Sequence, residues 1–219
     1  MNTYRKYDKI YRIDMPDYPI KGKYHLAKQK EKMLFSGIQT ILEKVDGANT
    51  GIYKVNGKVY LQKKGSNVDY SHPQYSFFQN EWYWKNIKKL KQLPDNIVVY
   101  GELMRCVHTI KYNKLPDWFL VFDIYDLRKK KYFNWITITN MCLSVGLSTV
   151  PFICEGRVKK EHLDRYMPNA SAYGKIAEGI VVKNYDKQVM GKYVKPEFVK
   201  AIEDSEFWRN KKIELNKVI

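Results

Sequence analysis

The stretch Leu42-Glu43-Lys44-Val45-Asp46-Gly47-Ala48-Asn49 decides how the rest of the sequence is interpreted. An apolar segment from Ile38 to Leu42 precedes it, and Gly51-Ile52-Tyr53 follows it. An apolar run that ends at Asp-Gly predicts a strand that gives way to a turn. Lys44 is therefore expected at a turn, either as an amine that reaches into a pocket and acts as a covalent nucleophile, or as an ordinary surface lysine.

A β-hairpin is predicted directly after this turn. Asn56-Gly57 separates two β-prone runs, Gly51–Val55 and Lys58–Gln62. Asn-Gly between two such runs is the strongest short-range hairpin signal, because both residues adopt positive φ easily. The turn at Lys44 and the hairpin thus form one antiparallel unit.

The remaining chain predicts an α+β fold with antiparallel sheets flanked by helices. Strands without regular helical crossovers between them are typical of this class. No repeat and no linker rich in Ser, Gly or Pro divides the sequence, so one continuous domain is expected. The predicted strands span residues 96–104, 118–125, 150–154, 179–184 and 189–195, and the predicted helices span 75–93, 137–145 (closed by Gly146), 159–166 and 196 to the C-terminus.

Composition favours an intracellular protein, expected in the cytoplasm. The 219 residues are 44% hydrophobic, which is enough for a sizeable core, but no run approaches the ~20 apolar residues of a membrane span. The polar start, Met1–Lys9, does not resemble a signal peptide. The 3 cysteines and 4 histidines are scattered, so the sequence suggests neither a disulfide framework nor a zinc site.

The charge points to a polyanionic partner. There are 39 Lys and Arg residues against 23 Asp and Glu residues, which gives a formal net charge of +16. The basic residues are dispersed along the chain, so they predict a basic surface. Nucleic acid is the leading candidate for a partner of such a surface.

Five short motifs occur in an order that resembles the covalent nucleotidyltransferases. They are Lys44-Val-Asp-Gly, Gly101-Glu102-Leu, Phe122-Asp123-Ile, Glu178-Gly-Ile-Val-Val-Lys183, and the lysines Lys192 and Lys195. Within that superfamily the chain resembles the ATP-dependent RNA ligases of the T4 RNA ligase 2 type. The resemblance implies a nucleotidyltransferase (adenylation) domain over residues 1–195. It leaves 196–219 as a C-terminal helical extension, with no separate C-terminal domain.

The resemblance also implies a reaction. In the family, a lysine attacks the α-phosphate of ATP, forms a lysyl-adenylate and releases pyrophosphate; here that role falls on Lys44. AMP then passes to a 5′-phosphate end, and a 3′-hydroxyl attacks the activated end. Charge develops on phosphate oxygens at every step, so such a site needs fixed cations and Mg²⁺ or Mn²⁺.

Roles for other residues follow from the resemblance alone. The expected metal-linked carboxylates are Glu178, Glu102 and Asp123. Phe122 matches the aromatic residue that stacks on adenine, although a core position explains it equally well from sequence. The residues expected to bind the nucleotide are Glu43, Lys44, Asn49, Lys64, Glu102, Phe122, Glu178, Lys183, Lys192 and Lys195.

Three features depart from the family pattern. Lysine, in Lys63-Lys64, stands where the family has arginine, and it lacks the bidentate guanidinium fork. Lys192 and Lys195 are three residues apart and would point to opposite faces of a regular strand, as would Glu178 and Lys183. The third departure is length: family members often carry a further C-terminal domain that helps to engage nucleic acid, whereas only Pro196 to Ile219 follows the last motif here.

Several functions stay open. Asn49 stands five residues after Lys44, where RNA ligases of this type carry asparagine and DNA ligases usually carry arginine, so joining of RNA is favoured over joining of DNA. An mRNA-capping guanylyltransferase would use GTP with the same lysine chemistry, and a non-catalytic basic RNA-binding module would explain the charge without the motifs. The expected partner is RNA, as a nicked duplex or broken strand ends, and a partner protein could supply the function of a C-terminal domain.

Overall fold

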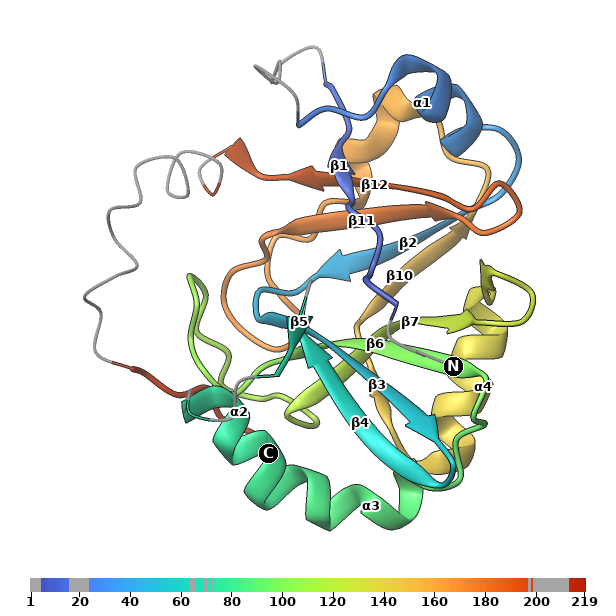
Figure 1. Cartoon of the computed structure of the whole chain (residues 1–219). Coiled ribbons are helices and arrows are strands. Elements are labelled where there is room, and N and C mark those ends of the chain that lie inside the picture. Colours follow the sequence, from blue (N-terminus) through green and yellow to red (C-terminus); the bar gives the residue numbers. More distant parts are fainter. Residues whose placement is uncertain are drawn as a thin grey trace.

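Two β-sheets and the helices that cover them make up the computed structural model of the chain (Figure 1). The structure describes residues 5–15, 24–63, 66–68, 71, 73–196, 198 and 213–219. The mixed architecture with antiparallel sheets confirms the predicted α+β class.

The first sheet has five strands in the order β1-β12-β11-β2-β10. Its central strand, β2, pairs antiparallel with β11 on one side and with β10 on the other. Side chains alternate along β2, so Ile41 packs against Leu34, Ile180 and Val182 on one face, and Leu42 points to the other. The strands are β1 (Tyr11–Arg12), β2 (Gln39–Lys44), β10 (Phe152–Gly156), β11 (Gly179–Asn184) and β12 (Val189–Val194).

The second sheet has seven strands, with β5-β4-β3-β6-β7-β8 in order and β9 beside β7. The predicted hairpin is confirmed: β3 and β4 are joined by Asn56 at φ 49° and Gly57 at φ 75°, the left-handed pair that a tight hairpin turn requires. The strands are β3 (Ala48–Val55), β4 (Lys58–Lys63), β5 (Ser66–Asn67), β6 (Ile97–Leu103), β7 (Phe119–Asp126), β8 (Lys131–Tyr132) and β9 (Ser148–Thr149).

The helices lie on the outer faces of the two sheets (Figure 1). The helix predicted over 75–93 is present but contains a π-helical turn, in which Phe78 and Trp82 stack with ring centroids 4.6 Å apart. The helix predicted over 137–145 starts two residues earlier, capped by Asn134, and ends at the left-handed Gly146 as expected. The helices are α1 (Lys28–Leu34), α2 (Pro73–Phe77), the π-helical segment Phe78–Tyr83, α3 (Trp84–Leu90), α4 (Trp135–Val145) and a 3₁₀ helix at Lys160–Tyr166.

The turn that follows Lys44 connects the two sheets. Lys44 is the last residue of β2 in the first sheet, and Ala48 is the first residue of β3 in the second. The three residues between them carry the chain from one sheet to the other. Lys44 therefore lies at the junction of the sheets, and the predicted strand before the turn is confirmed.

The predicted helix from Pro196 does not continue to the C-terminus. Residues 199–212 lie outside the described residues, and Ile213–Ile219 is not helical. This segment forms isolated β-bridges, Leu215 with Cys106 and Val218 with Leu115, so its backbone bonds to another part of the chain and not to its own preceding turn. The division of the chain at residue 195 stays a prediction.

Close packing of β11 on β12 gives a test of this fold. A Cβ atom added to Gly179 would lie 2.3 Å from the Tyr193 carbonyl oxygen and 2.9 Å from the Val194 Cα atom, both fixed backbone atoms. We expect Gly179→Ala to lower the free energy of unfolding in urea by about 2 kcal/mol or more. Gly156→Ala in β10 is the matched control, because nothing lies within 4 Å of its added Cβ. Equal stability of the two variants would contradict this packing.

Candidate active site

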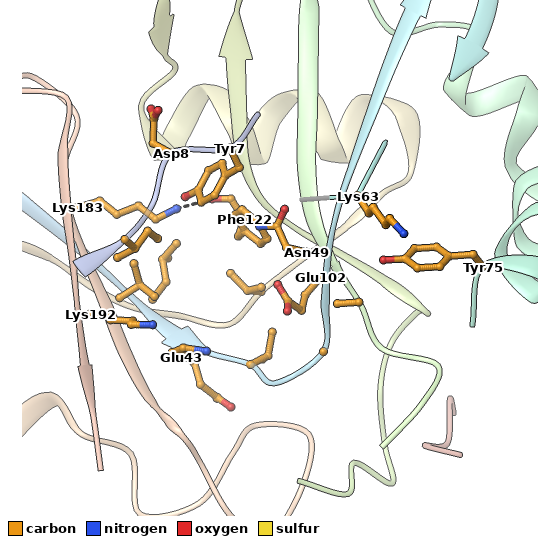
Figure 2. Close-up of a pocket in the computed structure, with 18 residues that line it drawn as sticks. Tyr7, Asp8, Glu43, Asn49, Lys63, Tyr75, Glu102, Phe122, Lys183 and Lys192 are labelled. Carbon is orange, nitrogen blue, oxygen red and sulfur yellow. Dashed lines mark hydrogen bonds between the residues drawn. The ribbon is translucent and has the colours of Figure 1, made fainter. Parts of the chain in front are cut away.

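A cavity of about 450 Å³ lies between the two sheets, at the turn that follows Lys44. Side chains from both sheets and from the N-terminal segment converge on it (Figure 2). The predicted residues that line it are Glu43, Lys44, Asn49, Glu102, Phe122, Lys183 and Lys192. Predicted Lys64 lies outside the described residues, and its neighbour Lys63 lines the cavity.

The amine of Lys44 is held by a carboxylate at the base of β11. Lys44 pairs with Gly179 in the sheet, so the preceding residue, Glu178, lies beside it, and Lys44 Nζ is 2.7 Å from Glu178 Oε2. Burial favours the neutral amine, but attraction from Glu178, Glu102 and Asp46 outweighs it and raises the pKa of Lys44. In the ligand-free protein Lys44 is therefore an ammonium ion.

Glu102 brings a second carboxylate into the cavity from the other sheet. It lies opposite Asn49, its partner in the pairing of β3 with β6. Burial raises the pKa of Glu102 to about 8, with Asp46 and Glu178 adding to the shift and Lys44 opposing it. Burial likewise raises the pKa of Glu178 against the influence of Lys44. Glu178 is therefore close enough to Glu102 to raise its pKa, and a cation bound between them would oppose that shift.

The site fits a metal ion that arrives with a nucleotide. Among the described residues, no group of three or more His, Cys, Asp or Glu side chains is placed to hold a metal alone. Mg²⁺ is commonly bound by one or two carboxylates together with substrate phosphates and water, and Mn²⁺ favours the same oxygen donors. Glu102 and Glu178 provide that number of carboxylates.

A buried ion pair joins the two sheets behind the cavity. Lys183 Nζ in β11 lies 2.7 Å from Asp123 Oδ2 in β7, with side chains 2% and 0% exposed. The carboxylate of Asp123 also accepts hydrogen bonds from the hydroxyls of Tyr7 and Tyr185. Burial lowers the pKa of Lys183, and Asp123 opposes that shift. Asp123 as a metal ligand stays a prediction that this geometry does not favour, because protein donors already occupy both oxygens.

A β-bulge explains how Phe122 reaches the cavity next to Asp123. Tyr100 pairs with Asp123, but the next residue of β6, Gly101, pairs with Val121, so Phe122 is an extra residue without a partner. The bulge breaks the usual alternation of side chains. The Phe122 ring centroid lies 5.6 Å from Lys183 Nζ (Figure 2), and Asp123 forms its ion pair with the same lysine. Phe122 packs edge-on against Tyr7, with ring centroids 5.0 Å apart, and its ring lines the cavity.

Glu43 lines the cavity, but its carboxylate lies apart from the other predicted groups, near Lys195. In Figure 2 the carboxylate of Glu43 points away from the other labelled side chains. It accepts hydrogen bonds from the Ser171 hydroxyl and, at 3.0 Å, from the Ala172 backbone N–H. Burial raises the pKa of Glu43, and Lys195 is among the groups that oppose the shift, so Lys195 lies near Glu43. Lys192 lines the cavity, whereas Lys195 lies near Glu43, so the two lysines have different surroundings.

Lys183 lines the cavity and Glu178 contacts Lys44 beside it, although an odd number of residues separates Glu178 from Lys183. Glu178 precedes the first residue of β11, so strand alternation does not govern its direction. Lys183, inside β11, lies on the same face as Val181 and Lys192, which pair with each other and also line the cavity.

Hydrogen bonds between Asp46 and residues 109–112 fix the turn after Lys44. Asp46 Oδ2 accepts backbone N–H groups from Thr109 at 2.6 Å and Ile110 at 3.0 Å, and the Asp46 N–H donates to the Tyr112 hydroxyl at 2.9 Å. A Cβ atom on Gly47 would lie 2.7 Å from the Leu103 carbonyl oxygen. The Asp-Gly pair of the motif is therefore needed for the turn itself.

Comparison with known proteins agrees with this geometry. A family model described as RNA ligase matches residues 39–195, which include both sheets of the cavity. The chain belongs to the RNA ligase family. A search of curated proteins gave no match. Among the described residues, no helix is long and apolar enough to cross a membrane.

Solved structures of an RNA ligase from Naegleria gruberi share the fold of this RNA ligase family member. A mutant with ATP and manganese has a TM-score of 0.69 at 17% identity, covering 93% of this chain and 60% of that one. The same ligase with pyrophosphate has a TM-score of 0.67 at 17% identity, covering 93% and 59%. A mutant with AMP and manganese has a TM-score of 0.67 at 17% identity, covering 93% and 60%. The chain thus spans about 60% of the length of the structures it matches.

Four polar residues that line the cavity were not predicted from the sequence: Tyr7, Asp8, Lys63 and Tyr75. Tyr7 and Asp8 belong to a segment with no periodic pattern, which reaches the cavity only through tertiary contacts. Lys63 was part of the Lys63-Lys64 pair, and strand alternation in the predicted hairpin was the signal that could have placed its side chain.

The raised pKa of Glu102 gives a prediction about stability. Because about 8 lies above the ordinary value of 4.5, the folded protein binds more protons than the unfolded chain between those pH values. Stability from the protonated carboxyl is full below that window and is lost as pH rises through about 8. We expect Glu102→Gln, which keeps a neutral side chain, to stabilise the metal-free protein more at about pH 9 than at about pH 5.

Urea unfolding at both pH values measures this difference. Glu161→Gln, at an exposed position, is the control and should change stability equally at the two pH values. A Glu102→Gln effect that is the same at both pH values would show that Glu102 titrates normally.

Proposed function

We propose that this chain is an ATP-dependent RNA ligase that joins 3′-hydroxyl and 5′-phosphate ends through AMP bound covalently to Lys44. The observation that carries the proposal is the position of the Lys44 amine. It lies at the junction of two sheets, beside one carboxylate from each sheet and in a cavity that also contains Lys183 and Lys192. An ordinary surface lysine has no such surroundings.

The first step is attack by Lys44 Nζ on the α-phosphorus of ATP. A phosphorus–nitrogen bond forms, the bond to pyrophosphate breaks, and the amine gives up its protons. Glu178 and Glu102 raise the pKa of Lys44 in the ligand-free protein, so the amine becomes nucleophilic only when their charge is balanced. Glu102 and Glu178 would hold Mg²⁺ or Mn²⁺, and that ion would balance their charge and neutralise phosphate oxygens.

The other residues bind and orient the nucleotide. Phe122 offers an aromatic face for adenine, and Lys192 and Lys63 supply positive charge for phosphates. Lys183 is already paired with Asp123, so it contributes mainly by fixing the cavity wall. Asn49 lies opposite Glu102 and lines the same cavity, which supports its role as a nucleotide contact. We retain Lys64, Lys195 and Glu43 as predicted contacts at the edge of the site.

The later steps transfer AMP to a 5′-phosphate end and use a 3′-hydroxyl to displace it. The net charge of +16 supports an RNA substrate, as a nicked duplex or broken strand ends in the cytoplasm. The Naegleria gruberi ligase has been solved with ATP and with AMP, which supports the same nucleotide here. We retain a partner protein that completes sealing as part of the proposal.

Covalent labelling tests the first step. Incubation with Mg²⁺ and α-labelled ATP should give label that stays on the chain in denaturing gel electrophoresis. Lys44→Ala should reduce the label to background, because no other amine has the same neighbours in the cavity described here. Lys159→Ala, an exposed lysine of the same chemistry, should keep full labelling. Label from GTP in place of ATP would favour a capping guanylyltransferase, and no label with either would favour a non-catalytic RNA-binding module.

Sealing of nicks tests the substrate. We expect a 5′-³²P nick with an RNA strand at the 3′-hydroxyl side to be sealed at least about tenfold faster than the same nick with DNA there, a difference of about 1.4 kcal/mol in the transition state. Asn49→Arg, which restores the residue of DNA ligases, should reduce that preference. A wild-type chain that seals the DNA nick faster would identify a DNA ligase.

A further inference from the structure

A buried asparagine ties the C-terminal segment, Ile213–Ile219, to the protein core. Asn216 is 3% exposed although its neighbours Leu215 and Val218 are not buried. Its Nδ2 group donates to the carbonyl oxygens of Met104 at 2.7 Å and Cys106 at 3.3 Å, and its Oδ1 accepts the Tyr112 N–H at 2.7 Å. The amide therefore makes three hydrogen bonds in a dry environment, where each is costly to lose.

Backbone hydrogen bonds on both sides hold this asparagine in register. The Asn216 N–H donates to the Arg105 carbonyl oxygen at 3.1 Å, and the Lys217 N–H donates to the Tyr112 carbonyl oxygen at 2.9 Å. The Val107 N–H donates in turn to the Glu214 carbonyl oxygen at 2.9 Å. All of these partners lie in residues 104–115, which we call the bracing segment. The backbone of Tyr112 is thus fixed at both its N–H and its carbonyl by the C-terminal segment.

The bracing segment is also what holds the turn after Lys44. Asp46 accepts the backbone N–H groups of Thr109 and Ile110 and donates its own N–H to the Tyr112 hydroxyl. Tyr112 is fully buried, so its hydroxyl has no water to replace that bond. A continuous series of hydrogen bonds therefore runs from Asn216 through Tyr112 to Asp46, two residues from Lys44.

We propose that Asn216 is a positioning residue for Lys44, acting through Tyr112 and Asp46. This inference rests on the proposed adenylylation of Lys44. Loss of the amide leaves the Tyr112 N–H and the Met104 carbonyl oxygen without partners, and the bracing segment shifts to recover them. The turn at Asp46-Gly47 shifts with this segment, because the turn is tightly packed: a Cβ atom added to Gly47 would collide with Leu103 and Glu102. The amine then meets the α-phosphorus in poorer alignment.

Single-turnover adenylylation with labelled ATP tests the proposal. We expect Asn216→Ala to lower the rate constant at saturating ATP about tenfold or more, since small misplacements of a reacting group cost up to about a hundredfold. The ATP concentration for half-maximal rate should change little, because Asn216 does not line the cavity. Lys217→Ala is the matched control: it removes an exposed side chain of the same segment and keeps the backbone bonds.

The amplitude of the reaction separates positioning from loss of folded protein. A variant that merely unfolds in part would show a lower amplitude at an unchanged rate constant, and that result would overturn the proposal. If Asn216→Ala does not fold, Asn216→Asp provides the same test. It keeps the acceptor for the Tyr112 N–H but places an oxygen against the Met104 and Cys106 carbonyls, so the rate constant should again fall.

A double-mutant cycle tests the route. Tyr112→Phe removes the hydroxyl that accepts the Asp46 N–H and should also slow adenylylation. If Asn216 acts through Tyr112, the double variant should be about as slow as the slower single variant; multiplied effects would mean independent roles and contradict the route. If the wild-type chain takes up no label, the proposed function is refuted. If the wild-type chain is labelled and Asn216→Ala is labelled at the same rate, only this inference is refuted.

Discussion

The buried pair of Lys183 and Asp123 is the constraint on which the site depends. It joins β11 of one sheet to β7 of the other, and the hydroxyls of Tyr7 and Tyr185 complete the bonding of the carboxylate. Removing two charges from water is costly, and a pair of this kind persists only when its remaining bonding groups are also satisfied. Its geometry fixes the distance between the sheets, and with it the width of the cavity.

The fixed separation of the sheets determines how the proposed catalytic groups lie relative to one another. Lys44 and Glu178 come from the first sheet, and Asn49 and Glu102 come from the second. Three residues connect Lys44 to β3, so the amine cannot move away from the carboxylates of either sheet. Glu178 holds Lys44 as an ammonium ion in the ligand-free protein. In the proposed mechanism, entry of the metal and the nucleotide balances that charge, so activation of the nucleophile is coupled to their binding.

Local patterns in the sequence predicted the longer strands and many of the residues that line the cavity. Asn56-Gly57 predicted the hairpin because the turn requires positive φ at both residues, and the apolar run before Asp46 predicted that Lys44 ends a strand. Strand alternation failed at Phe122, where a bulge adds a residue, and at Glu178, which precedes its strand. Apolar spacing from Pro196 onward predicts a helix to the C-terminus. The backbone of Ile213–Ile219 bonds instead to residues 104–115, and no local pattern encodes that partner.

Identification of the residue that carries AMP tests the central claim most directly. The wild-type chain, incubated with ATP and Mg²⁺, would be digested with a protease and its modified peptide sequenced by mass spectrometry. The account predicts a single AMP group on the ε-amine of Lys44, at the junction of the two sheets. AMP on any other residue, such as Lys63, Lys183 or Lys192 in the same cavity, would contradict it.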